Sequence, residues 1–177
     1  GCFCSHGHLD HAKYRKEYEA MGLDILAPQD FNPIRVNRQM GGFYVQAFKL
    51  PHGETDSYGL LIRHKNGETI LYLTDLSYCQ YCFKACKVNH YLVEVNYQNK
   101  YVDMEAPNYK HKISGHFSLE NCIDFLKANI TEHAKSVICL HLGVGSTNYE
   151  EITETIESIV PTGVYVDCAL PRRSFEL

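Results

Sequence analysis

The sequence lacks the features of a membrane or exported protein. Its 177 residues contain no run of about eighteen apolar residues, which a helix needs to cross a bilayer. A charged and then apolar leader is also missing, so secretion is not expected. Together with an ordinary apolar content of 45%, these absences predict a globular, cytoplasmic protein.

The chain also has no excess of positive charge. Lys and Arg number 17 against 21 Asp and Glu, which gives a net charge of −4. A protein that follows a nucleic-acid backbone needs a basic track. The basic residues that group even loosely are few: Arg35, Arg38, Lys100, Lys110 and Lys112. This balance favours a small substrate, and a local basic groove stays open as an alternative.

Internal repeats, low-complexity segments and flexible linkers are absent, so residues 1–177 are expected to form one domain. Hydrophobic patterns predict strands at 24–28, 43–50, 57–64, 69–76, 90–97, 136–143 and 163–169, and helices at 13–23, 118–130 and 148–160. Gly22 is a candidate helix C-cap, Ser118 a candidate N-cap, and Asn66-Gly67 a candidate hairpin turn. This mixture predicts an α/β fold, in which helices cover a sheet.

Eight cysteines are many for this length. Those within apolar runs, such as Cys139 and Cys168, are expected to be small buried side chains, and all eight to be reduced. Cys79, Cys82 and Cys86 are spaced closely enough for metal or redox chemistry. Zinc sites of this kind usually contain a second cysteine pair, which is missing here, so a role for these three is left open.

The most informative segment is SHGHLDH, which follows a short apolar run. Residues two apart in an extended segment point the same way, so His6 and His8 can reach one metal ion. A turn that begins near Asp10 would direct Asp10 and His11 at a second ion. We expect Gly7 to remove a side chain where the loop crowds the metal. Three histidines and an aspartate in six positions therefore predict a metal site.

Three more candidate ligands lie at the ends of predicted strands. These are His52, Asp75 and His141. With the four residues above they make seven imidazole or carboxylate groups, which zinc and manganese prefer and which suffice for two ions with one bridging group. The isolated histidines are expected to be solvated or structurally satisfied: His64, His90, His111 and His133.

In their order along residues 2–168, the segments HGHLDH, PHGETDSYGLLI, LYLTD and CLHLG resemble the metallo-β-lactamase superfamily. The resemblance implies an αββα sandwich, here N-terminally truncated because only GCFCS precedes the first motif. It assigns His6, His8 and His52 to one metal, Asp10, His11 and His141 to the other, and Asp75 to a bridge between them. It also implies two divalent ions, with zinc expected and manganese, iron or nickel as alternatives.

Two further segments narrow the resemblance. EVNY with Glu94, and GHFSLENC with His116, are similar to motifs of ribonuclease Z and its relatives, and closest to YycJ-like proteins and anti-Pycsar phosphodiesterases. The latter cleave cyclic nucleotides such as cCMP and cUMP. The resemblance implies that a metal-bound hydroxide attacks phosphorus at the Asp75-bridged centre. His116, oriented by Glu94, would protonate the leaving oxygen.

The expected function is therefore a metal-dependent hydrolase, a phosphodiesterase of cyclic nucleotides in a bacterial cell or a phage-infected host. A YycJ-like or ribonuclease Z-like nuclease that acts on single strands or ends is the first alternative, and a truncated, non-catalytic metal-binding module the second. The HFSLEN segment argues against a glyoxalase-like thioesterase. A homodimer is expected. Tyr97, Tyr101 and Tyr109 could stack on a base or anchor their own loop.

Overall fold

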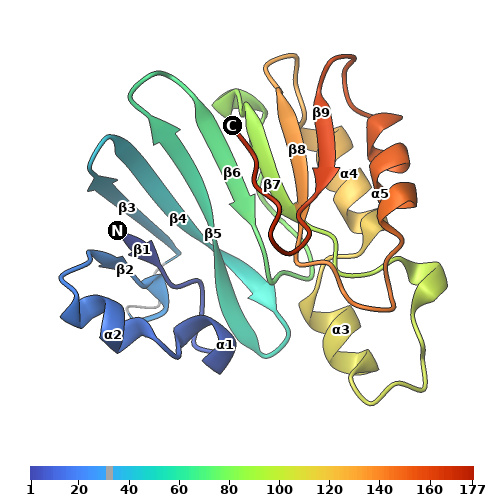
Figure 1. Ribbon diagram of the computed structural model, residues 1–177, viewed down its shortest axis with the longest axis horizontal. Coiled ribbons are helices and arrows are strands. Elements are labelled where there is room, and N and C mark those ends of the chain that lie inside the picture. The colour runs from blue at the N-terminus through green and yellow to red at the C-terminus, as the bar shows by residue number, and fades with distance from the viewer. Residues whose placement is uncertain (31–33) are drawn as a thin grey trace.

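A large sheet organises the computed structural model, which describes residues 1–30 and 34–177. Within these residues its seven strands lie side by side in chain order (Figure 1). They are β3 (Arg35–Met40), β4 (Phe43–His52), β5 (Thr55–His64), β6 (Thr69–Leu73), β7 (His90–Glu94), β8 (Ser136–Leu140) and β9 (Tyr165–Cys168). Neighbours are antiparallel from β3 to β6 and parallel from β6 to β9.

Helices α4 (Leu119–Asn129) and α5 (Tyr149–Glu157) cover one face of this sheet. Side chains alternate between the two faces of a strand, and one alternate set meets these helices. Leu71, Leu73 and Val93 of the strands form the main core with Leu126 and Ile152 of the helices, and all five are fully buried. Burial of apolar side chains of this size is the main force that holds such layers together.

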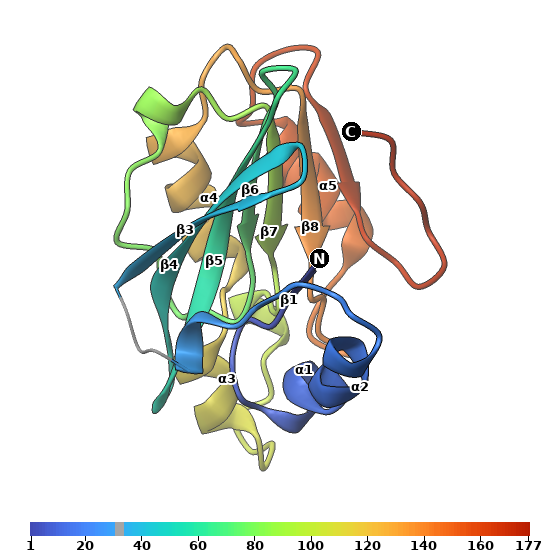
Figure 2. The same cartoon turned by 90° about the vertical axis from the view of Figure 1, so that its left-hand side faces the viewer.

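A small N-terminal unit covers part of the opposite face (Figure 2). In it, β1 (Cys2–Phe3) pairs in parallel with β2 (Ile25–Leu26), and α1 (Leu9–Ala12) and α2 (Arg15–Ala20) lie between them in the chain. Leu26 packs against Val45 of β4 and Leu60 of β5 in a second core. The order of layers is that of the expected αββα sandwich, with a second sheet of two strands in the described residues.

Most predicted elements are present, with shorter ends. The helix expected at 13–23 is only α2, and the strand expected at 24–28 is only β2. Gly22 has φ of 77°, so the expected left-handed stop after the helix is confirmed. Short 3₁₀ turns occupy Pro28–Asp30, Lys84–Cys86 and Asn99–Tyr101.

Three elements had no prediction: β3, α1 and α3 (Tyr109–Gly115). β3 has the sequence RVNRQM and lies at the edge of the sheet, where most of its side chains are exposed. α3 has the sequence YKHKISG, whose only buried residue is Gly115. Hydrophobic periodicity arises from one-sided burial, so elements with so little burial leave no such signal.

The parallel register brings strand ends together. Leu73 of β6 pairs with Val93 of β7, and Glu94 pairs with Leu140 of β8, so the three strands end at the same edge. The antiparallel strand β4 also ends there, at His52. Figure 1 shows α1 and α3 at this edge. No helix of the described residues is both long enough and apolar enough to cross a membrane.

Replacing Ser118 by alanine is expected to destabilise the fold by about 1 kcal/mol, because the side chain is a helix N-cap. Ser118 Oγ accepts the backbone N–H of Asn121 at 3.1 Å, which confirms the predicted cap of α4. Urea unfolding would measure the change. Ser118→Asp restores a capping oxygen and should retain most of the stability; equal losses in both variants would contradict the capping role.

Candidate metal centre

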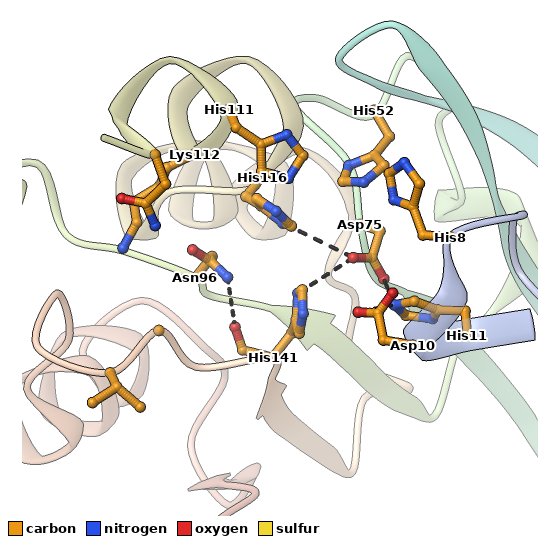
Figure 3. A pocket seen from close by; sticks show the side chains of 13 residues that line it. His8, Asp10, His11, His52, Asp75, Asn96, His111, Lys112, His116 and His141 are labelled. Carbon is orange, nitrogen blue, oxygen red and sulfur yellow. Dashed lines mark hydrogen bonds and ion pairs between the residues drawn. The ribbon is translucent and has the colours of Figure 1, made fainter. Parts of the chain in front are cut away.

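A pocket of about 360 Å³ opens at the edge where the strands end. Six of the seven predicted ligands line it, together with His116 (Figure 3). The full lining is His8, Asp10, His11, His52, Asp75, Asn96, Asn108, His111, Lys112, His116, His141, Gly143 and Val144. The seventh, His6, lies behind them and is fully buried.

His6, His8 and His52 form one compact group, in which the possible ligand nitrogens lie within 4.8 Å of one another. His6 Nε2 and His8 Nδ1 are 2.9 Å apart. His52 Nδ1 donates to the carbonyl of Gly115 at 2.6 Å, which leaves Nε2 as the nitrogen that can bind a metal. Burial, and then the neighbouring His11, lower the pKa of His6 to about 4, so its imidazole is neutral near pH 7 and can donate a lone pair.

Gly7 has no close neighbours in the chain, and its expected role beside an ion stays a prediction. A Cβ atom at this position would meet no described atom within 4 Å, and the residue is exposed. The loop is therefore not crowded at Gly7, and no larger side chain is excluded by contact with the chain.

Asp75 lies between the N-terminal histidines and the ends of the strands. Its Oδ2 is 3.7 Å from His11 Nε2, and its Oδ1 is 3.6 Å from His141 Nδ1. Figure 3 shows this carboxylate between the two rings. Asp10 Oδ2 is 3.4 Å from His11 Nε2, but its side chain is 77% exposed, and among the described residues it belongs to none of the compact groups. His11 and His141 are predicted ligands of the same ion, and Asp75 also forms a compact group with His6, a predicted ligand of the other ion. The role of Asp75 as a bridge stays a prediction.

Glu94 contacts two histidines. Its Oε1 accepts from His116 Nδ1 at 2.7 Å and from His141 Nδ1 at 3.0 Å, and its Oε2 accepts the N–H of Leu76 at 3.3 Å. Burial alone would raise the pKa of Glu94, but the two histidine hydrogen bonds outweigh it and the pKa is lowered. The hydrogen bond to Glu94 raises the pKa of His141 to about 9. Sequence reasoning paired Glu94 with His116 alone and missed His141.

Two residues at the strand ends adopt a backbone conformation that side chains disfavour. Asp75 has φ of 53° and His141 has φ of 52°. Such left-handed residues cost about 1–3 kcal/mol each and cluster at functional sites. The turn immediately after each strand therefore fixes the direction of these two side chains.

The pocket also contains residues that the sequence did not assign to the site. His111 of α3 is exposed, as expected, yet its ring lines the pocket and groups with His52 and His116. Asn96, Asn108, Lys112, Gly143 and Val144 line the pocket as well. His111 lies five positions before His116 in the sequence. This proximity was the only sequence signal that could have placed His111 at the pocket.

Other candidates lie outside the pocket. His90 is buried and bonded to Ser136 Oγ at 2.9 Å, so it is satisfied as expected. Tyr101 donates to Glu151 Oε1 at 2.9 Å, which fits the loop-anchor alternative, and Tyr97 and Tyr109 are absent from the described lining. All eight cysteines are free thiols in the described chain, and no compact group of metal-binding residues there contains Cys79, Cys82 or Cys86.

Solved structures that resemble this architecture have the metallo-β-lactamase fold, and the chain has this fold. The metallo-β-lactamase fold protein YhfI from Bacillus subtilis matches with a TM-score of 0.63 and 15% identity, over 94% of this chain and 73% of that chain. No protein-family model and no curated protein sequence matches.

Two further similar structures are of enzymes. A diphosphatase of the PhnP family matches with a TM-score of 0.56 and 15% identity, over 94% of this chain and 54% of that chain. The short form of human tRNase Z matches with a TM-score of 0.54 and 15% identity, over 94% of this chain and 74% of that chain. The chain thus spans about half the length of the diphosphatase.

Proposed function

We propose that the protein is a metal-dependent phosphodiesterase of small nucleotides, with cyclic nucleotides of the cCMP and cUMP type as substrates. One observation carries this proposal. Six of the seven predicted metal ligands and His116, which is hydrogen-bonded to the buried Glu94, meet at a single pocket, although they come from distant parts of the chain. The pocket can therefore combine cation binding with proton transfer.

The side chains of the pocket fit divalent cations. Two of the four compact groups of imidazole and carboxylate donors in the described residues consist of predicted ligands alone, with their ligand atoms within 4.8 Å of one another: His6–His8–His52 and His6–His11–Asp75. We propose that these groups, together with Asp10 and His141, hold two divalent ions, and that zinc is the preferred metal. When bound, such ions acidify a water molecule and neutralise charge on a phosphate.

His116 has the position of a proton donor. Glu94 accepts from Nδ1 at 2.7 Å, so this nitrogen is the one that carries the fixed proton. Nε2 of the same ring is then the atom from which a proton would pass to the departing oxygen of the substrate. Glu94 is completely buried, which fixes the orientation of the imidazole.

The pocket favours a small substrate. Its volume of about 360 Å³ is in the range of small-molecule sites, and the chain carries a net charge of −4. The similar structures include a diphosphatase and a tRNase, which supports chemistry on phosphate esters in general. The similarity to tRNase Z is the observation that favours the second candidate, a nuclease. Residence in the cytoplasm and a homodimer stay predictions.

A hydrolysis assay would test the proposal. The protein, loaded with zinc or manganese, would be given 3′,5′-cyclic CMP, UMP, AMP and GMP beside labelled single-stranded DNA and RNA. We expect cleavage of the cyclic pyrimidine nucleotides, lost after chelation and regained on adding metal, because the pocket residues need cations to bind phosphate. Cleavage of strands alone would replace the first candidate by the nuclease. Bound metal with no turnover on any substrate would favour the non-catalytic module.

A further inference from the structure

Helix α3 places one lysine at the far end of the pocket. Lys112 lines the same cavity as the candidate ligands, as do Asn96 and Asn108. In Figure 3, His116 and Asn96 lie between Lys112 and Asp75. The ammonium group of Lys112 and the carboxylate of Asp75 thus lie on opposite sides of His116.

The charge of Lys112 is not balanced by a carboxylate. Its Nζ donates to Ser146 Oγ at 2.7 Å, and among the described residues it forms no ion pair. Other lysines do have acidic partners, such as Lys100 with Glu151 and Lys135 with Glu68. Lys112 is half-buried, and burial lowers its pKa without an opposing contribution from any acidic group.

Ser146 holds the ammonium in place. This serine is buried, and its hydroxyl lies 3.1 Å from the carbonyl oxygen of Asn96 and 3.3 Å from that of Gly143. The hydroxyl donates to this backbone while its lone pair accepts from Lys112. The lysine is therefore held at the pocket wall rather than extended into solvent, where a charged side chain would be better hydrated.

We propose that Lys112 binds a phosphate oxygen of the substrate on the side of His116 away from Asp75. A cation that is half-buried without a counterion gains most from an anion that arrives with the ligand. This inference rests on the proposed function for the identity of the anion as phosphate. The phosphate that Lys112 binds is either the one that is cleaved or the adjacent phosphate of a linear nucleotide.

The test compares Lys112→Met with Lys112→Arg and with Lys110→Met. Methionine keeps the apolar stem and removes the charge, arginine keeps the charge, and Lys110 is an exposed lysine of the same helix outside the pocket lining. We expect Lys112→Met to raise KM roughly 10- to 100-fold, the range for a lost hydrogen bond to a charged group. Lys112→Arg should largely restore binding, and Lys110→Met should match the wild type.

The choice of substrates shows whether Lys112 binds the cleaved phosphate or the adjacent one. An equal loss on cyclic CMP and on the dinucleotide CpC, which has a single phosphate, means that Lys112 binds the cleaved phosphate. A loss confined to a dinucleotide with an added terminal phosphate means that it binds the neighbouring one. Wild-type KM in Lys112→Met on all substrates, or an equal loss in Lys110→Met, would overturn the proposal.

A binding measurement separates this inference from the proposed activity. Calorimetry on the metal-loaded protein would compare cytidine with cytidine 3′,5′-bisphosphate for the wild type and Lys112→Met. Suppose that no substrate is turned over, but Lys112→Met weakens the binding of the bisphosphate and not of cytidine. The anion site at Lys112 would then be supported, and the proposed phosphodiesterase activity would be refuted. Equal bisphosphate affinities for the two proteins would refute the site.

Discussion

Replacing Asp75 by alanine should remove metal from the protein and reduce turnover by about 10³-fold or more, since a metal centre contributes several kcal/mol to catalysis. The carboxylate is only 2% exposed, and its two oxygens face His11 and His141 from opposite sides. Elemental analysis of the purified variant, set beside the wild type, would measure the lost metal.

Two controls make this result specific. Asp75→Asn keeps the shape of the side chain and tolerates the left-handed backbone at φ of 53°, so its metal content reports the loss of charge alone. Asp124→Ala removes an exposed aspartate of α4 that lies outside the pocket lining and should retain all metal. Full metal occupancy in Asp75→Ala would show that this carboxylate is not a ligand.

Replacing His116 by alanine should lower kcat by about 10²–10⁴-fold and leave the metal content unchanged, the effect of a lost general acid. The ring bonds to Glu94 at 2.7 Å, and its Nδ1 is 4.0 Å from Asp75, in one compact group with Asp75, Glu94 and His141. The loss should be much smaller on an aryl phosphodiester such as bis(p-nitrophenyl) phosphate. Its leaving group departs without a proton, so kinetics on the two substrates would isolate the role of His116.

His133→Ala is the matched control, because His133 is a partly exposed histidine outside the pocket lining. It should retain both metal and activity. Loss of metal in His116→Ala equal to that in Asp75→Ala would assign His116 to the metal centre instead. An equal loss of rate on the alkyl and aryl substrates would also exclude the acid role.

The sequence predicted the residues of the centre better than their surroundings. His52, Asp75 and His141 were found because each comes at the end of an apolar strand, where the pattern changes abruptly. α3, which carries His111 and Lys112, is polar on nearly every side and has no periodic signal. The second histidine partner of Glu94 depends on the register between β7 and β8, which is a tertiary feature.

In the fold, too, buried elements were predicted better than exposed ones. The strands of the main core were predicted because they bury alternate or continuous apolar side chains, and α4 was predicted with its cap. β3 was missed because an edge strand satisfies its backbone on one side only and leaves its side chains in water. Local sequence thus reports burial and caps, whereas pocket walls made of exposed polar residues become visible only after folding.

The shared strand ends have a practical consequence for engineering. The turn at 65–68 joins β5 to β6, and the segments at 131–135 and 161–164 lead from α4 and α5 into β8 and β9. All three lie at the edge opposite to the pocket, because β5 ends and β6, β8 and β9 begin there. Fluorophores, affinity tags or inserted reporter domains at these turns would lie a full strand length from the chemistry. The sheet therefore offers one edge for immobilisation or imaging and keeps the other unobstructed for substrate.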